Sequence, residues 1–104
     1  MARPSLQSGT GTQTRIRSEL KPPSMWRVIL HNDDYTTQDF VVFILTSIFR
    51  KAEAEATRIM MDVHRQGRGV AGVYPHEIAE TKAAQVHALA EQQEFPLKCT
   101  LEVE

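Results

Sequence analysis

The apolar and polar positions from residue 25 onward follow regular periods, whereas residues 1–22 follow none. Alternation over 25–30 predicts a strand with one buried face, and a similar alternation over 97–103 predicts a second strand. A short apolar run at 69–74 predicts a third. Three short strands are therefore expected, spread from the start to the end of the periodic region.

Three other runs have the spacing of a helix. In the first, Phe40–Ile48, apolar residues recur every three to four positions, although its β-branched residues would also permit a strand. Thr36 or Thr37 can cap such a helix, and Asp39 in its first turn suits the helix dipole. Length and capping favour the helix.

The second helical run is 51–66, where Gly67 provides the left-handed residue that often ends a helix. The third begins at Pro75, which ends the preceding strand and suits the start of a helix, and it continues to about Gln93. Its apolar stripe includes Ile78, which is expected to face the core.

The order strand, helix, helix, strand, helix, strand (β-α-α-β-α-β) is best satisfied by an α+β fold. We expect a two-layer sandwich in which one three-stranded antiparallel sheet carries all three helices on a single face. Residues 23–104 are expected to form this domain, and the polar residues 1–22 a disordered N-terminal arm.

Composition narrows the function classes. The 104 residues carry a formal net charge of −1, which gives no electrostatic signal for nucleic acid or an anionic membrane, and no apolar run is long enough for a membrane span. The single cysteine, Cys99, is expected to be buried and reduced, as in a cytoplasmic protein. One alternative stays open, because the arm has Arg, Ser and Thr but no acid before Glu19, a composition shared with organellar transit peptides.

The candidate chemistry centres on the turn between the first strand and the first helix. Asn32, Asp33 and Asp34 are turn-forming residues, but they also place one amide and two carboxylates together. With a neutral imidazole, such acceptors can satisfy the three N–H donors of an ammonium group. His64 is the candidate imidazole. Its place near a helix end has another explanation, because the helix dipole there favours a charged histidine.

A metal site is the main alternative for the same part of the chain. His31, Asp33, Asp34 and His64 are possible ligands, but their spacing matches no standard zinc or calcium pattern. A nucleophilic hydrolase is less favoured, because Cys99 is expected to point into the core and no serine sits in a strained turn. We therefore expect no enzyme activity, no cofactor and no bound metal.

Several separated motifs add a second kind of information. They are Lys21–Met25, Val28–Thr36, Met60–His64, Gln66-Gly67, Gly72-Val73, Ala79–Lys82, Pro96-Leu97 and Cys99–Glu102. In order and spacing these motifs closely resemble the ClpS family, the bacterial N-degron adaptors of the ClpAP protease. The resemblance covers about residues 21–104.

The resemblance implies a monomeric adaptor that binds the free N-terminus of a protein beginning with Leu, Phe, Tyr or Trp. The adaptor then delivers that protein to the ClpA unfoldase, with the N-terminal arm serving as the flexible extension used in delivery. The alternatives left open are a small metal-dependent hydrolase and another binding module of similar fold.

The resemblance also assigns residues to three roles. The substrate α-amino group would be bound by Asn32, Asp33, Asp34 and His64, with Asp33 also holding the loop. The hydrophobic pocket for the first side chain would be lined by Thr36, Gln38, Val41, Met60, Val63 and Leu97. The surface that docks on the ClpA N-terminal domain would include Glu77, Glu80 and Lys82. Gln38 departs from the family, because many members have Met at this rim position, so the preferred first residue stays open.

Overall fold

The computed structural model describes residues 24–104, so the predicted arm and its boundary lie outside the described residues. Six elements occur in the expected order. They are β1 (Met25–His31), α2 (Gln38–Ser47), α3 (Glu53–Gln66), β2 (Arg68–Pro75), α4 (His76–Gln92) and β3 (Lys98–Val103).

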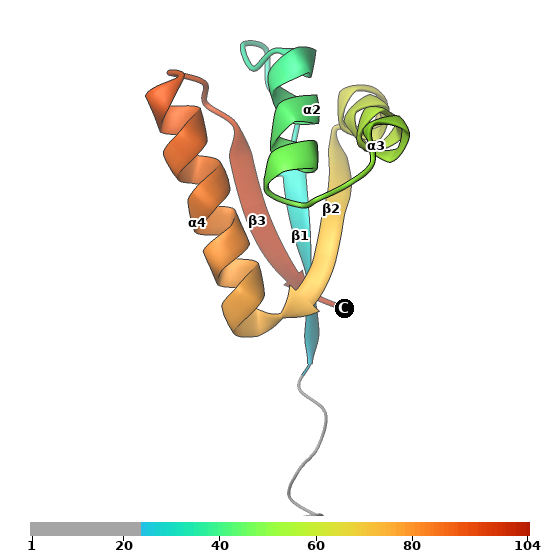
Figure 1. The fold of residues 1–104 in the computed structure, drawn as a ribbon, viewed down its shortest axis with the longest axis vertical. Helices are drawn as coiled ribbons and strands as arrows, with labels where there is room; N and C mark the ends of the chain where they lie inside the picture. The colour runs from blue at the N-terminus through green and yellow to red at the C-terminus, as the bar shows by residue number, and fades with distance from the viewer. Residues whose placement is uncertain (1–23) are drawn as a thin grey trace, which may run out of the picture.

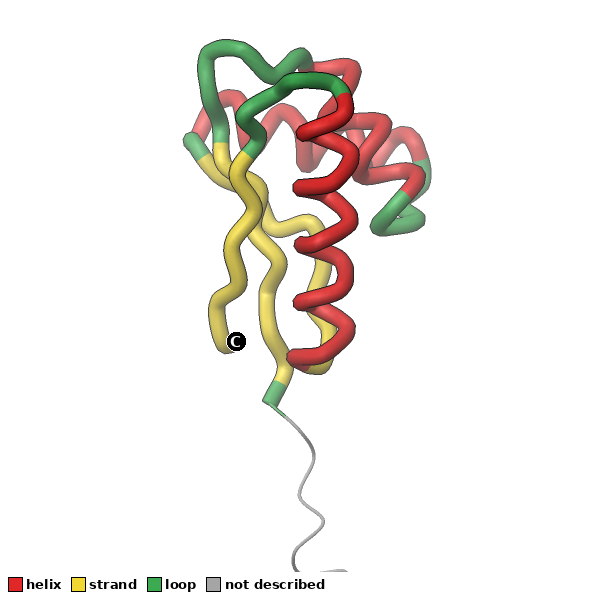
Figure 2. The backbone as a smooth tube through the Cα atoms, turned by 90° about the vertical axis from the view of Figure 1, so that its left-hand side faces the viewer, coloured by secondary structure: helices red, strands yellow, loops and turns green. Residues whose placement is uncertain are grey.

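The three strands form one antiparallel sheet in the order β2-β1-β3, with β1 in the centre (Figure 1). Figure 2 shows the strands as one layer and the three helices together on one side of it. The predicted α+β two-layer sandwich is therefore confirmed. Among residues 24–104, none of the helices has the length and hydropathy of a membrane span.

The core lies between the sheet and the helical layer. Val28 and Leu30 of β1 are fully buried against it, as alternation predicts. Cys99 of β3 joins the same cluster, and burial raises the pKa of its thiol to about 12, so the thiol stays protonated and unreactive.

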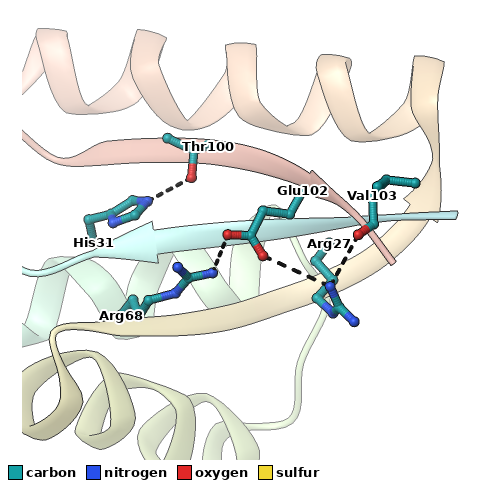
Figure 3. A network of polar contacts seen from close by, with 6 residues as sticks. All are labelled: Arg27, His31, Arg68, Thr100, Glu102 and Val103. Carbon is teal, nitrogen blue, oxygen red and sulfur yellow. Dashed lines mark hydrogen bonds and ion pairs between the residues drawn. The ribbon is translucent and has the colours of Figure 1, made fainter.

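The opposite face of the sheet is less open than the sequence suggests. Ile29 is fully buried although alternation places it on that face, where it pairs with Val70 and Thr100 on the neighbouring strands. Arg27 and His31 flank it on β1 and belong to a polar network drawn in Figure 3. The prediction that only one face of β1 is buried was therefore wrong.

Several element boundaries differ from the sequence-based prediction. Helix α3 begins at Glu53 rather than at residue 51, because Arg50 has the left-handed φ of 58° and the Lys51 N–H bonds back to the Leu45 carbonyl. Strand β2 includes Pro75, which then stands before α4 rather than inside its first turn.

Helix α4 also presents a different face from the one expected. Its buried residues are Ala79, Val86 and Ala90, whereas Ile78 is 47% exposed. The assignment of Ile78 to the core was wrong. Its neighbour in sequence, Ala79, takes the inward position of the first turn.

Candidate functional site

The turn after β1 is held by one carboxylate. Asp33 Oδ1 accepts from the Tyr35 N–H at 2.8 Å and the Thr36 N–H at 2.7 Å, and Oδ2 accepts from the Thr36 hydroxyl at 2.7 Å. Burial by itself would raise the pKa of Asp33, but these bonds from Thr36 and Tyr35 outweigh it and lower the pKa below its ordinary value. Asp33 is therefore an ionised brace of the turn.

Two further contacts fix the ends of this turn. The Asn32 N–H donates to the Gly67 carbonyl at 2.9 Å, which ties the turn to the end of α3. Gly67 has a φ of 88°, and this left-handed conformation, which glycine adopts without strain, aims the chain back toward β1. At the other end, the Thr37 hydroxyl accepts from the Phe40 N–H at 3.1 Å and caps α2.

Helix α3 is placed by close packing against β2. A Cβ added at Gly69 would lie 2.8 Å from Cγ2 of Val63 and 3.2 Å from the Ile59 carbonyl oxygen. Glycine at this position therefore lets the strand approach the helix. Since Val63 and the next residue, His64, both line the pocket beside the turn, this packing helps to position α3 relative to the turn.

A pocket of about 450 Å³ lies between the turn, the start of α2 and α3. It is lined by Asn32, Asp33, Asp34, Tyr35, Thr36, Thr37, Gln38, Val41, Met60, Val63 and His64. Val41, Met60 and Val63 are at most 8% exposed and provide an apolar floor. The polar residues Asn32, Asp34 and His64 are exposed, so they stand at the rim.

The rim has unused hydrogen-bonding capacity and negative charge. Within residues 24–104, the side chains of Asn32, Asp34 and His64 make no hydrogen bond or ion pair. Asp33 and Asp34 contribute two carboxylates, and the lining residues that belong to the described part of the chain include no Lys or Arg. A cationic donor group beside an apolar side chain fits this combination.

The structure brings most of the predicted site residues together. All four residues predicted to bind the α-amino group line the pocket, as do five of the six predicted for its hydrophobic part. Leu97 is the exception: it is 4% exposed, belongs to the core cluster, and lines a second, larger hollow of about 820 Å³ that shares Tyr35 with the pocket. Tyr35 and Thr37 line the pocket but were missed, although Tyr35 lies inside the Val28–Thr36 motif and Thr37 directly follows it.

A metal site is not supported by the geometry of the four possible ligands. His31 Nε2 lies 2.6 Å from the Thr100 hydroxyl on the open face of the sheet, as Figure 3 shows, and it does not line the pocket. Burial, then Lys98 and Arg68, lower the pKa of His31, which favours its neutral form. Among residues 24–104, no group of three or more His, Cys, Asp or Glu side chains is arranged to hold a metal ion.

Comparison with known proteins gives a consistent result. Residues 21–100 match the family described as ATP-dependent Clp protease adaptor protein ClpS. The ClpS adapter protein of Syntrophus aciditrophicus is 64% identical over 80 residues, which are 77% of this chain and 75% of that protein. The one from Nitratidesulfovibrio vulgaris is 55% identical over 94 residues, covering 90% of this chain and 94% of that protein.

A solved structure is also similar. It is that of Agrobacterium tumefaciens ClpS2 bound to L-phenylalaninamide, with a TM-score of 0.77 and 42% sequence identity. The match covers 80% of this chain and all of that one.

Proposed function

This chain belongs to the ClpS family of ATP-dependent Clp protease adaptors, which are not enzymes, and we propose that its pocket captures free protein N-termini that begin with Leu, Phe, Tyr or Trp. The observation that carries the proposal is the pocket itself, in which an acceptor-rich rim of Asn32, Asp34 and His64 adjoins a buried apolar floor. A polypeptide offers an ammonium group next to a bulky side chain at one place, its first residue.

Binding energies explain why both parts of the pocket are needed. Burying about 120 Å² of a first side chain contributes about 3 kcal/mol, at about 25 cal/mol per Å². Micromolar affinity corresponds to about 8 kcal/mol, so the ammonium contacts must supply much of the difference. An internal Leu or Phe has no ammonium group and would be excluded.

The ligand of the similar structure supports the same interpretation. L-phenylalaninamide has a free α-amino group and an aromatic side chain, and its terminal amide imitates the next peptide bond. We infer that the α-amino group and the side chain of a first residue Phe bind in this pocket in the same way. Titration of a short Phe-peptide tests this directly: saturable micromolar binding is expected, and no binding would contradict the proposal.

We further propose that the Clp unfoldase bound by this adaptor is ClpA, through a docking surface on the first two turns of α4. Glu77 and Glu80 are exposed there, and Lys82 is half-buried. Ile78, at 47% exposure, adds an apolar side chain between the two acids in sequence. Polar residues around an exposed apolar side chain are typical of a docking surface. The adaptor is proposed to act as a monomer in the cytoplasm.

Binding is expected to weaken as the pH falls from about 8 to 5. His64 must be neutral to accept from an ammonium group, because a protonated imidazole has no acceptor and repels the ligand. Asp33 does not cause the weakening, because its pKa lies below the ordinary value of a carboxyl group, so the carboxylate stays ionised and the turn stays intact across this pH range. Peptide titrations across this range, repeated with His64→Ala, would detect the effect, and tighter binding in acid would contradict it.

Thr36→Val is expected to weaken Phe-peptide binding about fivefold, the equivalent of about 1 kcal/mol. The change removes the hydroxyl that bonds Asp33 Oδ2 at 2.7 Å but keeps the shape of the side chain. Thr36→Ser is the matched control, because it keeps the hydroxyl. If the valine and serine variants bind equally well, the hydrogen bond from the Thr36 hydroxyl to Asp33 does not contribute to peptide binding.

Gln38→Met is expected to tighten binding of Phe- and Trp-peptides several-fold and to leave Ile- and Val-peptides weak. Methionine has nearly the volume of glutamine, so the crowding of β-branched first residues is retained. The glutamine amide, however, loses water when a large apolar side chain enters, at a cost of about 1 kcal/mol. Fluorescence anisotropy on one peptide series measures this. Unchanged Phe affinity or a gain of Ile binding would show that Gln38 acts in another way.

A further inference from the structure

A second hollow adjoins the pocket proposed for the first residue, which is called the peptide pocket from here on. The hollow has a volume of about 820 Å³ and lies beside the turn after β1, the end of α4 and the segment that leads into β3. Tyr35 is 76% exposed and lines both cavities, so its side chain stands between them. Figures 1 and 2 show the turn after β1 and the connection from α4 to β3 at the same end of the molecule. A ligand in the peptide pocket therefore has this hollow as its neighbour.

The shape of the hollow follows from the way α4 ends. Glu94 has the left-handed φ of 61°, and its N–H donates to the Glu91 carbonyl at 3.0 Å. The Phe95 N–H donates to the Ala90 carbonyl at 2.9 Å, and the Phe95 ring packs on that of Phe40 in α2 with 5.0 Å between the ring centres. These contacts fix the backbone of the lining residues, so the fold itself forms the hollow.

The hollow combines an apolar floor with negative charge. Leu97 and Ala90 are at most 4% exposed, and the half-buried Phe95 lines the hollow with them. Glu91 and Glu94 are exposed, and neither forms an ion pair with another residue in 24–104. None of the described residues that line the hollow is a Lys or an Arg. A side chain with an apolar stem and a cationic end fits both parts.

His87 is the one residue of the described lining that could add positive charge. Its Nε2 accepts from the Cys99 N–H at 3.2 Å, which ties α4 to β3 beside the hollow. An imidazole that accepts at one nitrogen carries no proton there and is neutral. While it makes this bond, His87 does not offset the charge of Glu91 and Glu94.

The direction of a bound peptide leads toward this hollow. Its ammonium group would be held by Asn32, Asp34 and His64, and His64 belongs to α3, which lies on the opposite side of α2 from α4 in Figure 1. A chain that continues away from its ammonium group runs from the α3 side toward Tyr35 and the end of α4. In an extended chain the first and third side chains point to the same side, about 7 Å apart, whereas the second points to the other side. Two cavities divided by one side chain match this arrangement.

We propose that the hollow binds the third side chain of an N-terminal peptide and selects Lys or Arg at that position. The aliphatic stem lies on Leu97 and Phe95 beside the Tyr35 ring, and the cationic end lies near Glu91 and Glu94. The inference rests on the proposed function, because it needs the first residue in the peptide pocket. It is specific to one position, since a general attraction of positive charge would act on the second residue as well.

The test compares four peptides with free N-termini, which begin Phe-Ala-Ala, Phe-Ala-Lys, Phe-Lys-Ala and Phe-Ala-norleucine. Their binding to the full-length adaptor is measured by fluorescence anisotropy. Lys in the third position is expected to tighten binding about fivefold over Ala, whereas Lys in the second position should change it by less than about twofold. Norleucine keeps the stem without the charge, so its gain should be smaller than that of Lys. Equal gains from Lys in the second and third positions would overturn the inference.

Variants of the adaptor test the two carboxylates. The double variant Glu91→Gln and Glu94→Gln is expected to bind the Phe-Ala-Lys and Phe-Ala-Ala peptides within about twofold of each other. Glu53→Gln is the matched control, because Glu53 is an exposed carboxylate in the first turn of α3 and lines neither cavity. It should keep the full preference for Lys. In the wild type this preference should shrink at high salt, because exposed charges are screened.

The possible outcomes separate this inference from the proposed function. If the Phe-Ala-Ala peptide binds but Lys in the third position brings no gain, the inference is overturned and the peptide pocket is not affected. The same holds if the double variant keeps the full gain. If the wild type binds neither the Phe-Ala-Ala nor the Phe-Ala-Lys peptide, the proposed function and the inference fail together. Should the double variant not fold, the two single variants decide the question.

Discussion

Replacing Asp34 or His64 with alanine is expected to weaken binding of a Phe-peptide about thirtyfold, equivalent to about 2 kcal/mol. Each side chain stands at the exposed rim of the pocket and has no hydrogen bond to other residues within 24–104. Each is therefore available to accept from the ligand's ammonium group, and removing one leaves an ammonium donor unpaired beside an apolar floor. The fold should survive, because neither side chain belongs to the core.

Asp62→Ala is the matched control for these two variants. Asp62 is a carboxylate on α3, close to His64 in sequence, but it pairs with Arg58 at 3.4 Å and does not line the peptide pocket. Its removal should leave peptide affinity within twofold of wild type. Wild-type affinity in both Asp34→Ala and His64→Ala, with unchanged circular dichroism, would refute the assignment of the α-amino site.

Deleting residues 2–20 is expected to slow degradation of an N-degron substrate by ClpAP at least about tenfold while peptide affinity stays within about twofold. Of the residues in 24–104, those that line the pocket all lie from Asn32 to His64, and the deletion changes none of them. Delivery is a separate step in which the arm is proposed to engage the unfoldase. Degradation of a fluorescent substrate and anisotropy of a labelled peptide measure the two steps on one preparation.

Replacing the same residues with an unrelated polar sequence of equal length is the control for this deletion. It distinguishes a need for length from a need for particular residues. Full degradation activity after the deletion would show that the arm is not needed for delivery. The assignment of the pocket would not be affected.

The order of helices and strands could be predicted because the patterns that indicate them lie within short stretches of sequence. The apolar spacing of α2, the cap at Thr37 and the left-handed Gly67 each depend on a few neighbouring residues. Ile29 and Ile78 were misplaced because their burial depends on what lies across the sheet and beside α4, which no local pattern records. The late start of α3 has a similar cause, a contact from Lys51 back to α2.

Part of the candidate site could also be predicted from a short stretch of sequence. Asn32, Asp33 and Asp34 are contiguous, so their clustering follows from the sequence. His64 was a candidate from its side-chain chemistry, but only the family resemblance placed it at the turn, because the contacts that bring α3 there run through Gly67 and Gly69, far along the chain. The bracing role of Asp33 and the burial of Leu97 in the core became visible only with the side chains in place.

The most direct test of the account compares two peptides that differ only at the α-amino group. Both begin with Phe, and one of them is N-acetylated, so its apolar side chain is intact and its ammonium group is gone. We expect saturable micromolar binding of the free peptide and binding at least a hundredfold weaker for the acetylated one. Equal affinities for the two peptides would contradict it, because recognition would then depend on the apolar floor without the rim of Asn32, Asp34 and His64.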